Sequence, residues 1–362
     1  MLHHKAFKFR IYPNHEQIVQ LRKTLGCSRF VFNHLLEKWN QVYQETGKGL
    51  SYNTCASQLP AMKRKWPWLK EVDSIALQSA VRNLADGFQR FFKRQNDPPC
   101  FKSRKHPVQS YTTRYTNGNI TLKGDRLQLP KLGWVRYATS REVEGRILSA
   151  TVRLAPSGKW FVSVISEVDI QPLPLTEGIL GIDVGIKQLA VTSEGLAIHN
   201  PRYTLRYERL LAKWQRILAR RQRGGGNWNK ARRKVAQIHE RIGNSRLDTM
   251  HKQTTRWIRE NQTISIEDLR IANMMKNRHL AKHIADASWG EMSRQLHYKA
   301  KWYGRTIKET PAFAPTSQTC HVCGNKHAEV KDLSIRIWKC SFCQTVHDRD
   351  MNAAQNIKAM AL

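Results

Sequence analysis

Four cysteines near the end of the sequence have the spacing of a metal site. Cys320 and Cys323 form one Cys-x2-Cys pair, Cys340 and Cys343 form a second, and 16 residues separate the pairs. Two such pairs suit one tetrahedral zinc ion, and a site closed by four thiolates is structural rather than catalytic. Disulfides are disfavoured by the expected cytoplasmic location, and a redox motif is disfavoured because there are two pairs. We therefore predict one structural Zn²⁺.

Two histidines lie beside these cysteines, and three further cysteines lie elsewhere. His321 and His347 could each replace a thiolate, but four cysteines make such a replacement unnecessary. Cys27, Cys55 and Cys100 lack partners at metal-site spacing, so we predict that they are ordinary buried or surface thiols. The zinc prediction therefore concerns the four paired cysteines alone.

Three acids are candidates for a second kind of metal site. Asp183 lies inside an apolar segment, Glu267 ends another, and Asp350 precedes a run of small residues. An unpaired carboxylate on a buried strand is costly, although one aspartate alone could equally cap the turn at Gly185. Three carboxylates together suit a pair of divalent cations that hydrolyse a phosphodiester, because one metal activates water and the other stabilises the leaving oxygen.

Asp348 competes with Asp350 for the third position. In an extended segment both side chains point to the same side, so either could reach a metal. The run from Asn352 to Ala354 begins a predicted helix, which places Asp350 at or near its N-terminus. The helix dipole there favours an ionised carboxylate. The alternative is that Asp350 is only an N-cap, but a cap needs no partner acids on separate strands, and we therefore choose Asp350.

The composition indicates a polyanionic partner. The 362 residues include 61 Lys or Arg and 28 Asp or Glu, which gives a formal net charge of +33. Such self-repulsion is best explained by nucleic acid. The opening residues contain no apolar signal segment, and no run approaches the roughly 18 apolar residues of a membrane helix. We predict a cytoplasmic prokaryotic protein, associated with the nucleoid when bound to DNA, with no membrane partner and no small-molecule substrate.

The most basic segment lies between the first two candidate acids. From Arg202 to Arg259 there are 17 Lys or Arg against three acids, with apolar residues at helical spacing on both sides of a glycine-rich turn. This pattern predicts an αα-hairpin with one packed seam and a surface that follows a phosphate backbone. The candidate nucleic-acid-binding residues, here and on the first strand, are Lys8, Arg10, Arg220, Arg221, Arg223, Lys230, Arg232 and Arg233.

The periodicity of the rest of the chain predicts the elements that hold these residues. Lys5–Pro13 alternates as a half-buried strand, with Phe7, Phe9 and Ile11 inward, and Asn14 with Gln17 resembles a capping box. Residues 74–94 form an amphipathic helix of a small helical domain, with Leu77, Val81, Leu84, Phe88 and Phe91 on its apolar stripe. Period-two hairpins after residue 111 indicate a β-barrel, which the first strand would join. The proline-rich segment Asp169–Gly178 is the predicted domain boundary, and a β-meander follows it.

The combination of these motifs resembles a known family. "GIDVGIKQLAVTS", "ISIEDL", the two Cys-x2-Cys pairs after "PTSQT", and "DRDMNAAQNI" are similar to the TnpB proteins of IS200/IS605-type transposons. These proteins are small relatives of the Cas12 nucleases. The resemblance covers essentially the whole chain, including "KFRIYPN" and "SWGEMSRQLHYKAKWYG". It matches Asp183, Glu267 and Asp350 to three RuvC carboxylates that bind Mg²⁺, with Mn²⁺ as a substitute, and the four cysteines to a zinc ribbon.

The resemblance implies a multidomain α/β architecture with a β-barrel. A wedge β-barrel would consist of residues 1–13 and 108–172, interrupted by a helical recognition domain at 14–107. A RuvC-like nuclease domain of RNase H fold would span 173–317, with the basic hairpin at 202–260. A zinc ribbon that binds the target nucleic acid would follow at 318–347, and the final RuvC motif and helix at 348–362. The implied function is RNA-guided cleavage of double-stranded target DNA, with a guide RNA from the transposon end.

Three other functions remain open from the residues. "GIDVG" would also suit the phosphate hairpin of an actin-like ATPase, although no second hairpin of that kind and no adenosine loop follow. A nuclease-inactive, RNA-guided repressor is a second alternative, and the presence of all three acids disfavours it. A transposase, or an accessory DNA-binding protein of transposition, is the third, because RNase H folds support both hydrolysis and strand transfer.

Overall fold

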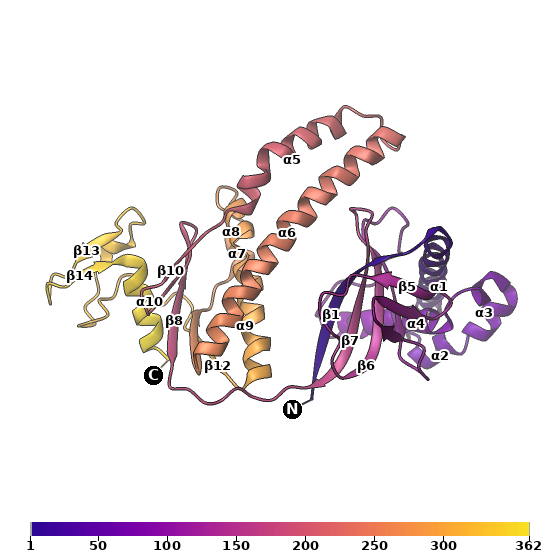
Figure 1. Cartoon of the computed structure of the whole chain (residues 1–362), viewed down its shortest axis with the longest axis horizontal. Coiled ribbons are helices and arrows are strands. Elements are labelled where there is room, and N and C mark those ends of the chain that lie inside the picture. Colours follow the sequence, from indigo (N-terminus) through magenta and orange to yellow (C-terminus); the bar gives the residue numbers. More distant parts are fainter. Residues whose placement is uncertain (1, 362) are drawn as a thin grey trace. The chain divides into compact units, whose positions relative to one another are not determined.

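The structure, a computed structural model, describes residues 2–361. The chain forms two compact units, one from Leu2 to Asp169 and one from Ile170 onward (Figure 1). The elements of the first unit are β1 (Leu2–Tyr12), α1 (His15–Thr46), α2 (Tyr52–Ala56), α3 (Leu59–Lys65), the 3-10 helix η1 (Pro67–Lys70), α4 (Ser74–Phe92), β2 (Gln109–Arg114), β3 (Thr121–Lys123), β4 (Arg126–Leu129), β5 (Gly133–Tyr137), β6 (Arg146–Leu154) and β7 (Trp160–Asp169).

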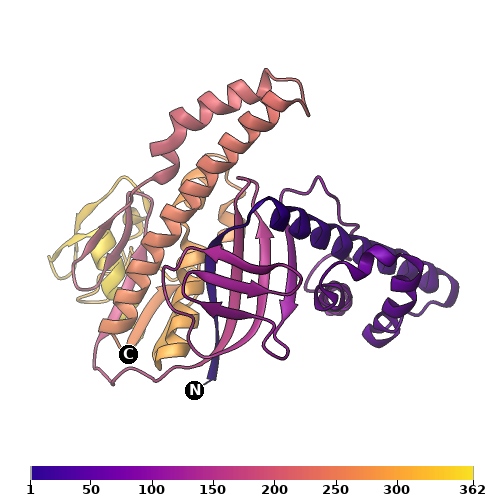
Figure 2. The same ribbon diagram turned by 45° about the vertical axis from the view of Figure 1, so that its right-hand side comes forward.

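The first unit is built on a seven-stranded sheet in the order β2-β6-β7-β1-β5-β4-β3 (Figure 2). Strand β1 pairs antiparallel with β7 from Leu2↔Asp169 to Ile11↔Trp160 and also pairs with β5. Because β1 lies in the middle of the sheet, the helices between β1 and β2 are an insertion, as predicted. The described pairings leave β2 and β3 as free edges, so the predicted β-barrel is corrected to an open sheet. Strand β3, with three residues, is too short to close a barrel.

The inserted helices share their own core. Helix α1 begins with the predicted capping box, in which Asn14 accepts from the Gln17 backbone and the Gln17 side chain accepts from the Asn14 backbone. Helix α4 buries the predicted stripe as far as Phe88, whereas Phe91, one residue before the helix ends, is 37% exposed.

The second unit contains a five-stranded sheet in the order β10-β9-β8-β11-β12. Strands β8, β9 and β10 form the predicted antiparallel meander, while β11 is parallel to both β8 and β12. The elements of this unit are β8 (Ile179–Val184), β9 (Gln188–Thr192), β10 (Ala197–His199), α5 (Tyr203–Ala219), α6 (Gly226–Glu260), β11 (Thr263–Glu267), α7 (Ile271–Met274), α8 (Ala281–Ala287), α9 (Trp289–Tyr303), β12 (Thr306–Thr310), the 3-10 helix η2 (Ala328–Lys331), β13 (Ile337–Lys339), β14 (Val346–Asp348) and α10 (Arg349–Ala359).

Helices cover this sheet on both faces (Figure 1). Alternation along β8 sends Leu180 and Ile182 into the core shared with α6 and α9. Gly181 faces the other way, where α10 packs on β8. Asp183 is two residues after Gly181 on β8, so its side chain points to the same face of the sheet, which α10 covers.

Helices α5 and α6 form the predicted basic hairpin and diverge from the sheet as a long projection (Figure 1). The predicted seam is only partly buried on α5, where none of the described residues is fully buried. Helix α6 buries Ile238 and Ile242 of the predicted seam. The difference arises because α5 contacts a single partner helix along most of its length, so each of its apolar residues stays open on one side.

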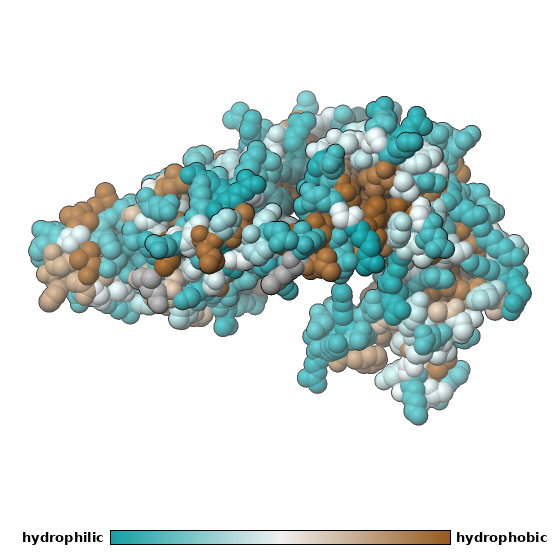
Figure 3. Space-filling model, turned by 60° about the horizontal axis from the view of Figure 1, so that its bottom comes forward, coloured by the Kyte–Doolittle hydropathy of each residue, from teal (hydrophilic) through white to brown (hydrophobic). Residues whose placement is uncertain are grey.

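The ribbon that carries the four cysteines has a very small core. Besides the thiols, only Val330 and Trp338 are buried in its cluster, and Ile335 is partly buried. Its other large apolar residues lie outside, and Figure 3 shows apolar surface gathered at the end where β13 and β14 lie. The exposed apolar residues are Val322, Leu333, Ile337, Phe342 and Val346. So little apolar burial leaves the metal as the main stabilising element of the ribbon.

None of the helices in the described chain is long and apolar enough to cross a membrane.

Candidate nuclease and zinc sites

Two of the candidate acids lie at the carboxyl ends of adjacent parallel strands. Strands β8 and β11 are paired in register up to Ile182↔Ile266. Asp183 and Glu267 each follow that pair by one residue, and both have the side-chain parity of the face that α10 covers. Parallel neighbours are about 4.8 Å apart, so the two carboxylates begin from neighbouring backbone positions.

The third acid comes from α10. The helix begins at Arg349, and Asp350 lies in its first turn, as predicted. The N-cap is Asp348, whose side chain accepts from the backbone N–H of Met351 at 2.9 Å, so the capping role belongs to Asp348 and not to Asp350. Asp348 is exposed, whereas Asp350 is half-buried.

The three carboxylates interact electrostatically. Burial raises the pKa of Asp183 well above its usual range, and the charges of Glu267 and Asp350 raise that pKa further. Burial also raises the pKa of Glu267, against a hydrogen bond from Thr316 that lowers it. Carboxylates that resist joint ionisation lose much of that cost when a divalent cation lies between them. The three acids therefore fit Mg²⁺ by their chemistry, although within the described chain only the four cysteines lie close enough together to form a compact ligand cluster.

Two partners of these acids were not among the predicted site residues. The Thr316 hydroxyl donates to Oε1 of Glu267 at 2.9 Å, and Nη1 of Arg336 pairs with Oδ1 of Asp350 at 3.1 Å. Thr316 lies just before the first cysteine pair and Arg336 lies between the two pairs. The segment that leads into the ribbon therefore contacts Glu267, and the ribbon itself contacts Asp350.

Two asparagines of α10 connect the helix to the segment before the first cysteine pair. The amide of Asn356 donates to the carbonyl oxygens of Thr316 and Thr319 at 2.7 and 2.6 Å, and the amide of Asn352 donates to the same two carbonyls. Oδ1 of Asn352 accepts from the backbone N–H of His321 at 3.0 Å. Both asparagines are buried. The helix that carries Asp350 and the loop that carries Thr316 are thus held as one piece.

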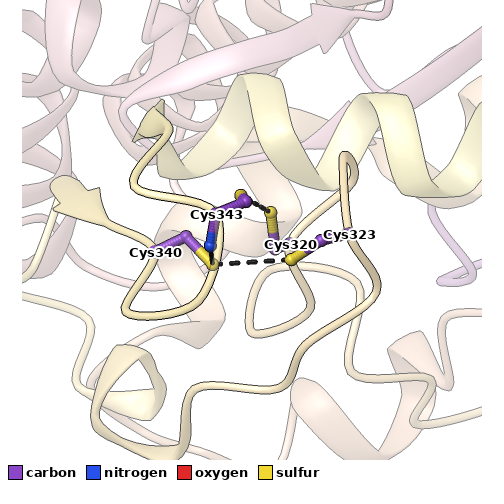
Figure 4. Close-up of side chains that lie close together, drawn as sticks. All are labelled: Cys320, Cys323, Cys340 and Cys343. Carbon is purple, nitrogen blue, oxygen red and sulfur yellow. Dashed lines mark hydrogen bonds between the residues drawn. The ribbon is translucent and has the colours of Figure 1, made fainter.

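The four predicted zinc ligands come together (Figure 4). Sγ of Cys320 and Cys343 are 3.6 Å apart, Sγ of Cys323 and Cys340 are 3.6 Å apart, and all four sulfurs lie within 4.8 Å of one another. Zn–S bonds of about 2.3 Å in a tetrahedron require S···S separations of about 3.8 Å. The cluster therefore fits one Zn²⁺.

Imidazoles surround this cluster without replacing a thiolate. Nε2 of His347 lies 3.1 Å from Sγ of Cys320, and Nε2 of His327 lies 3.3 Å from Sγ of Cys340. Imidazoles at these distances can hydrogen-bond the thiolates and orient them. His347 was expected beside the ligands. His327 was not expected, since nothing in its sequence context distinguishes it.

At Gly181, β8 lies close to the backbone of α10. A Cβ atom there would meet the carbonyl oxygen of Ala354 at 2.2 Å and the backbone nitrogen of Lys358 at 2.6 Å. Gly181→Ala must therefore move α10, and with it Asp350, away from β8. We expect a loss of about 3 kcal/mol in the free energy of unfolding, the upper range for overpacking, measured by denaturant titration.

The control for this substitution is Gly243→Ala. Gly243 lies inside α6, and a Cβ there meets no atom within 4 Å. That change should be neutral or should stabilise the protein by up to about 1 kcal/mol, because alanine favours helix. Equal unfolding free energies for the two variants would contradict the close packing of α10 on β8.

The predicted nucleic-acid-binding residues are all exposed. Lys8 and Arg10 lie on β1 of the first unit, with Lys8 over the ring of Phe161 and Arg10 over that of Tyr12. The other six lie around the tip of the hairpin formed by α5 and α6, at the end of α5, in the turn and in the first turns of α6. The structure thus places these cations on two surfaces, one in each unit.

Three families match parts of the chain. Residues 161–278 match the family described as "Probable transposase" (OrfB_IS605), and residues 289–357 match "Cas12f1-like, TNB domain". Residues 1–48 match a family described as "Helix-turn-helix domain", although here they contain β1 and the single helix α1.

Two full-length relatives and two solved structures are similar to the chain. A Streptomyces pristinaespiralis protein called "Putative RNA-guided DNA endonuclease" is 39% identical over 99% of this chain and 89% of its own. The Escherichia coli K12 protein called "Putative RNA-guided DNA endonuclease InsQ" is 34% identical over 98% and 92%. In fold, the chain resembles Cas12f1 from a complex with sgRNA and target DNA (TM-score 0.62, 14% identity, 99% of both chains). It also resembles the mini RNA-guided endonuclease Cas_phi3 (TM-score 0.51, 10% identity, 99% and 92%).

Proposed function

The chain belongs to the TnpB family of IS200/IS605-type transposon proteins, and from that premise we propose that it is an RNA-guided DNA endonuclease. The observation that carries the proposal is that Asp183 and Glu267 lie at the ends of adjacent parallel strands, on a sheet against which α10, the helix of Asp350, packs. The charges of the other two carboxylates raise the pKa of the buried Asp183. An acidic centre in a chain of net charge +33 is suited to hold metal ions against a phosphodiester.

The nuclease unit is of the RuvC type, with an RNase H-like fold. Its sheet order, β10-β9-β8-β11-β12, with three antiparallel strands followed by two parallel ones, supports this proposal. The open sheet of the first unit would be the wedge domain and its inserted helices the recognition domain. We assign residues 1–13 and 108–172 to the wedge domain and residues 14–107 to the recognition domain.

Asp183, Glu267 and Asp350 would hold Mg²⁺, with Mn²⁺ as a substitute. When bound, two such ions supply an activated water and stabilise the leaving oxygen. The chain's own residues orient the carboxylates. The Thr316 hydroxyl fixes one oxygen of Glu267, so that the other is available to a ligand. The guanidinium of Arg336, beside Asp350, provides a cation that a phosphodiester could contact.

The proposed partners are a guide RNA transcribed from the transposon end and double-stranded target DNA. The names of the relatives and the contents of the Cas12f1 complex support RNA and DNA as partners. Sequencing the RNA that co-purifies with the protein tests this. We expect one discrete species encoded beside the gene. Random fragments in proportion to their abundance would instead indicate a non-specific binder.

The tip of the basic hairpin should contribute to nucleic-acid binding. Replacing Arg220, Arg221 and Arg223 with Gln removes three exposed cations. If all three contact phosphates, the slope of log K against log salt should fall by about 2 to 3, because each contact contributes about 0.7 to 0.9. Filter binding of RNA and of DNA across a salt series measures the slope.

A matched control removes three cations from the far end of α6. Lys252 and Arg256 pair there with Asp248 and Glu260, and Arg259 lies in the last turn. The triple Gln variant of these residues should retain most of the slope. An unchanged slope in the variant of the tip would mean that Arg220, Arg221 and Arg223 only face solvent.

A further inference from the structure

A hollow of about 590 Å³ opens where β9 begins and β10 leads into α5, and none of the candidate site residues lines it. Four of its eight lining residues are basic or imidazole side chains and none is acidic. Among the described residues, no salt bridge involves Lys187, Arg202 or Arg206, so all three cations are available to a ligand. The lining residues are Lys187, Gln188, His199, Asn200, Pro201, Arg202, Leu205 and Arg206.

The topology puts this cationic pocket at the same end of the sheet as the acids. Strand β8 ends beside Asp183, and the next residues form the turn that contains Lys187. Strand β9 runs back and β10 returns, so its carboxyl end, with His199 and the start of α5, also reaches the end where Asp183 and Glu267 lie. Strands β8 and β10 are separated by two strand spacings, or about 10 Å. This distance corresponds to about two or three phosphates along a nucleic-acid strand.

A buried side chain builds the pocket. Asn200, 3% exposed, donates to the carbonyl oxygen of Ile186 at 2.8 Å and accepts from the backbone N–H of Arg202 at 3.1 Å. It therefore ties the turn that carries Lys187 to the start of α5. Arg202 is held at φ 44°, a left-handed conformation that costs an arginine about 1 kcal/mol or more. The cations are thus brought together by the backbone before any ligand binds.

One further group in the lining lacks a partner. Oε1 of Gln188 is buried and accepts no hydrogen bond in the structure. Buried acceptors in proteins are nearly always satisfied, so a donor from a ligand or from water belongs there. A nucleotide offers donors on its base as well as phosphate oxygens for the cations.

We propose that this pocket binds the backbone of the DNA strand that is being cut, next to the scissile phosphodiester. The inference rests on the proposed nuclease function, because it takes the acids as the point of cleavage. Lys187 and Arg206 contact phosphate oxygens, and Asn200 holds the two segments in place. The pocket orients the strand, and the three carboxylates act on it.

The test is a double substitution, Lys187→Gln with Arg206→Gln, in the full-length protein with its co-purified RNA. Arg259→Gln with Lys301→Gln is the control. It removes the same charge from the same unit, but these residues precede β11 and β12 and so lie at the opposite end of the sheet. The probe is a fluorescent single-stranded DNA of 12 nucleotides, without added Mg²⁺. We expect the double variant to bind about tenfold more weakly, with a salt slope lower by about 1.4, and the control to match wild type.

A second measurement tests whether the pocket binds the strand next to the scissile bond. Uncharged methylphosphonates are placed one at a time on the linkages near the cleavage position. In wild type they should raise KM severalfold and change kcat by no more than about twofold. In the double variant the same replacements should change KM little. Wild-type binding by the double variant would overturn the proposal. Equal weakening in the control, or a loss of co-purified RNA in place of DNA affinity, would also overturn it. The binding arm gives its answer even if the protein cleaves nothing, so failure of the pocket and failure of the nuclease proposal are distinguishable.

Discussion

Asp350→Asn should abolish DNA cleavage in Mg²⁺ while guide RNA and target binding persist. The substitution removes one negative charge from the three carboxylates without changing the shape of the side chain, so the acids lose metal affinity and the fold stays intact. Loss of one member of a catalytic unit commonly costs on the order of 10³-fold or more in rate. Cleavage of a labelled target by the protein–RNA complex measures the rate, and a gel shift of the same DNA measures binding.

Asp348→Asn is the matched control, two residues away in the same motif. Asp348 caps α10 through its hydrogen bond with Met351, and asparagine caps helices about as well as aspartate. Cleavage should therefore fall only slightly. If cleavage survives Asp350→Asn and fails with Asp348→Asn, the assignment of the third acid is wrong. If neither change matters, the acids of this segment do not belong to a nuclease site.

Cys340→Ser should lose the zinc ion together with much of the fold of the ribbon. Cys340 is fully buried, and the only apolar residues buried in the described cluster of the ribbon, besides its thiols, are Val330 and Trp338. Metal binding by such a small unit is coupled to its folding and contributes roughly 10 kcal/mol or more. Elemental analysis should find one zinc per chain in wild type and almost none in the variant.

Loss of zinc should also reach the nuclease centre. Arg336 of the ribbon pairs with Asp350, and Thr316, two residues before the ribbon, donates to Glu267, so a disordered ribbon should reduce cleavage as well. Cys100→Ser is the control, because Cys100 is exposed and remote in sequence from the four ligands. It should keep its zinc and its activity. Full zinc content in Cys340→Ser would refute the four-thiolate assignment.

The backbone positions of the candidate acids could be predicted from the sequence because two of them interrupt an apolar pattern and the third lies at a predicted helix start. Asp183 and Glu267 stand out as charges at the ends of buried strands, and the helix that starts at Arg349 places Asp350. The groups that orient these acids could not be predicted. Thr316 and Arg336 belong to segments without periodicity, and a contact between segments that lie far apart in the sequence leaves no local pattern.

The open sheet of the first unit shows a similar limit. Period-two alternation identifies its strands and their inward faces, and the hairpins β3–β4 and β6–β7 are where the turns predict them. Closure into a barrel depends instead on whether the two edge strands meet. The edge strands here are the short β3 and the six-residue β2. Alternation of apolar and polar residues does not predict whether these two strands pair with each other. The hairpin seam was overestimated for a related reason, since helical spacing does not reveal how many partners cover a helix.

One measurement tests the central claim most directly. The purified protein–RNA complex is mixed with Mg²⁺ and two plasmids that differ only in whether they carry a segment complementary to the RNA that co-purifies, beside a library of flanking sequences. The account predicts cleavage of the complementary plasmid alone, within a subset of flanking sequences, and no cleavage by Asp350→Asn. Cleavage of both plasmids alike, cleavage of neither, or undiminished cleavage by Asp350→Asn would contradict it.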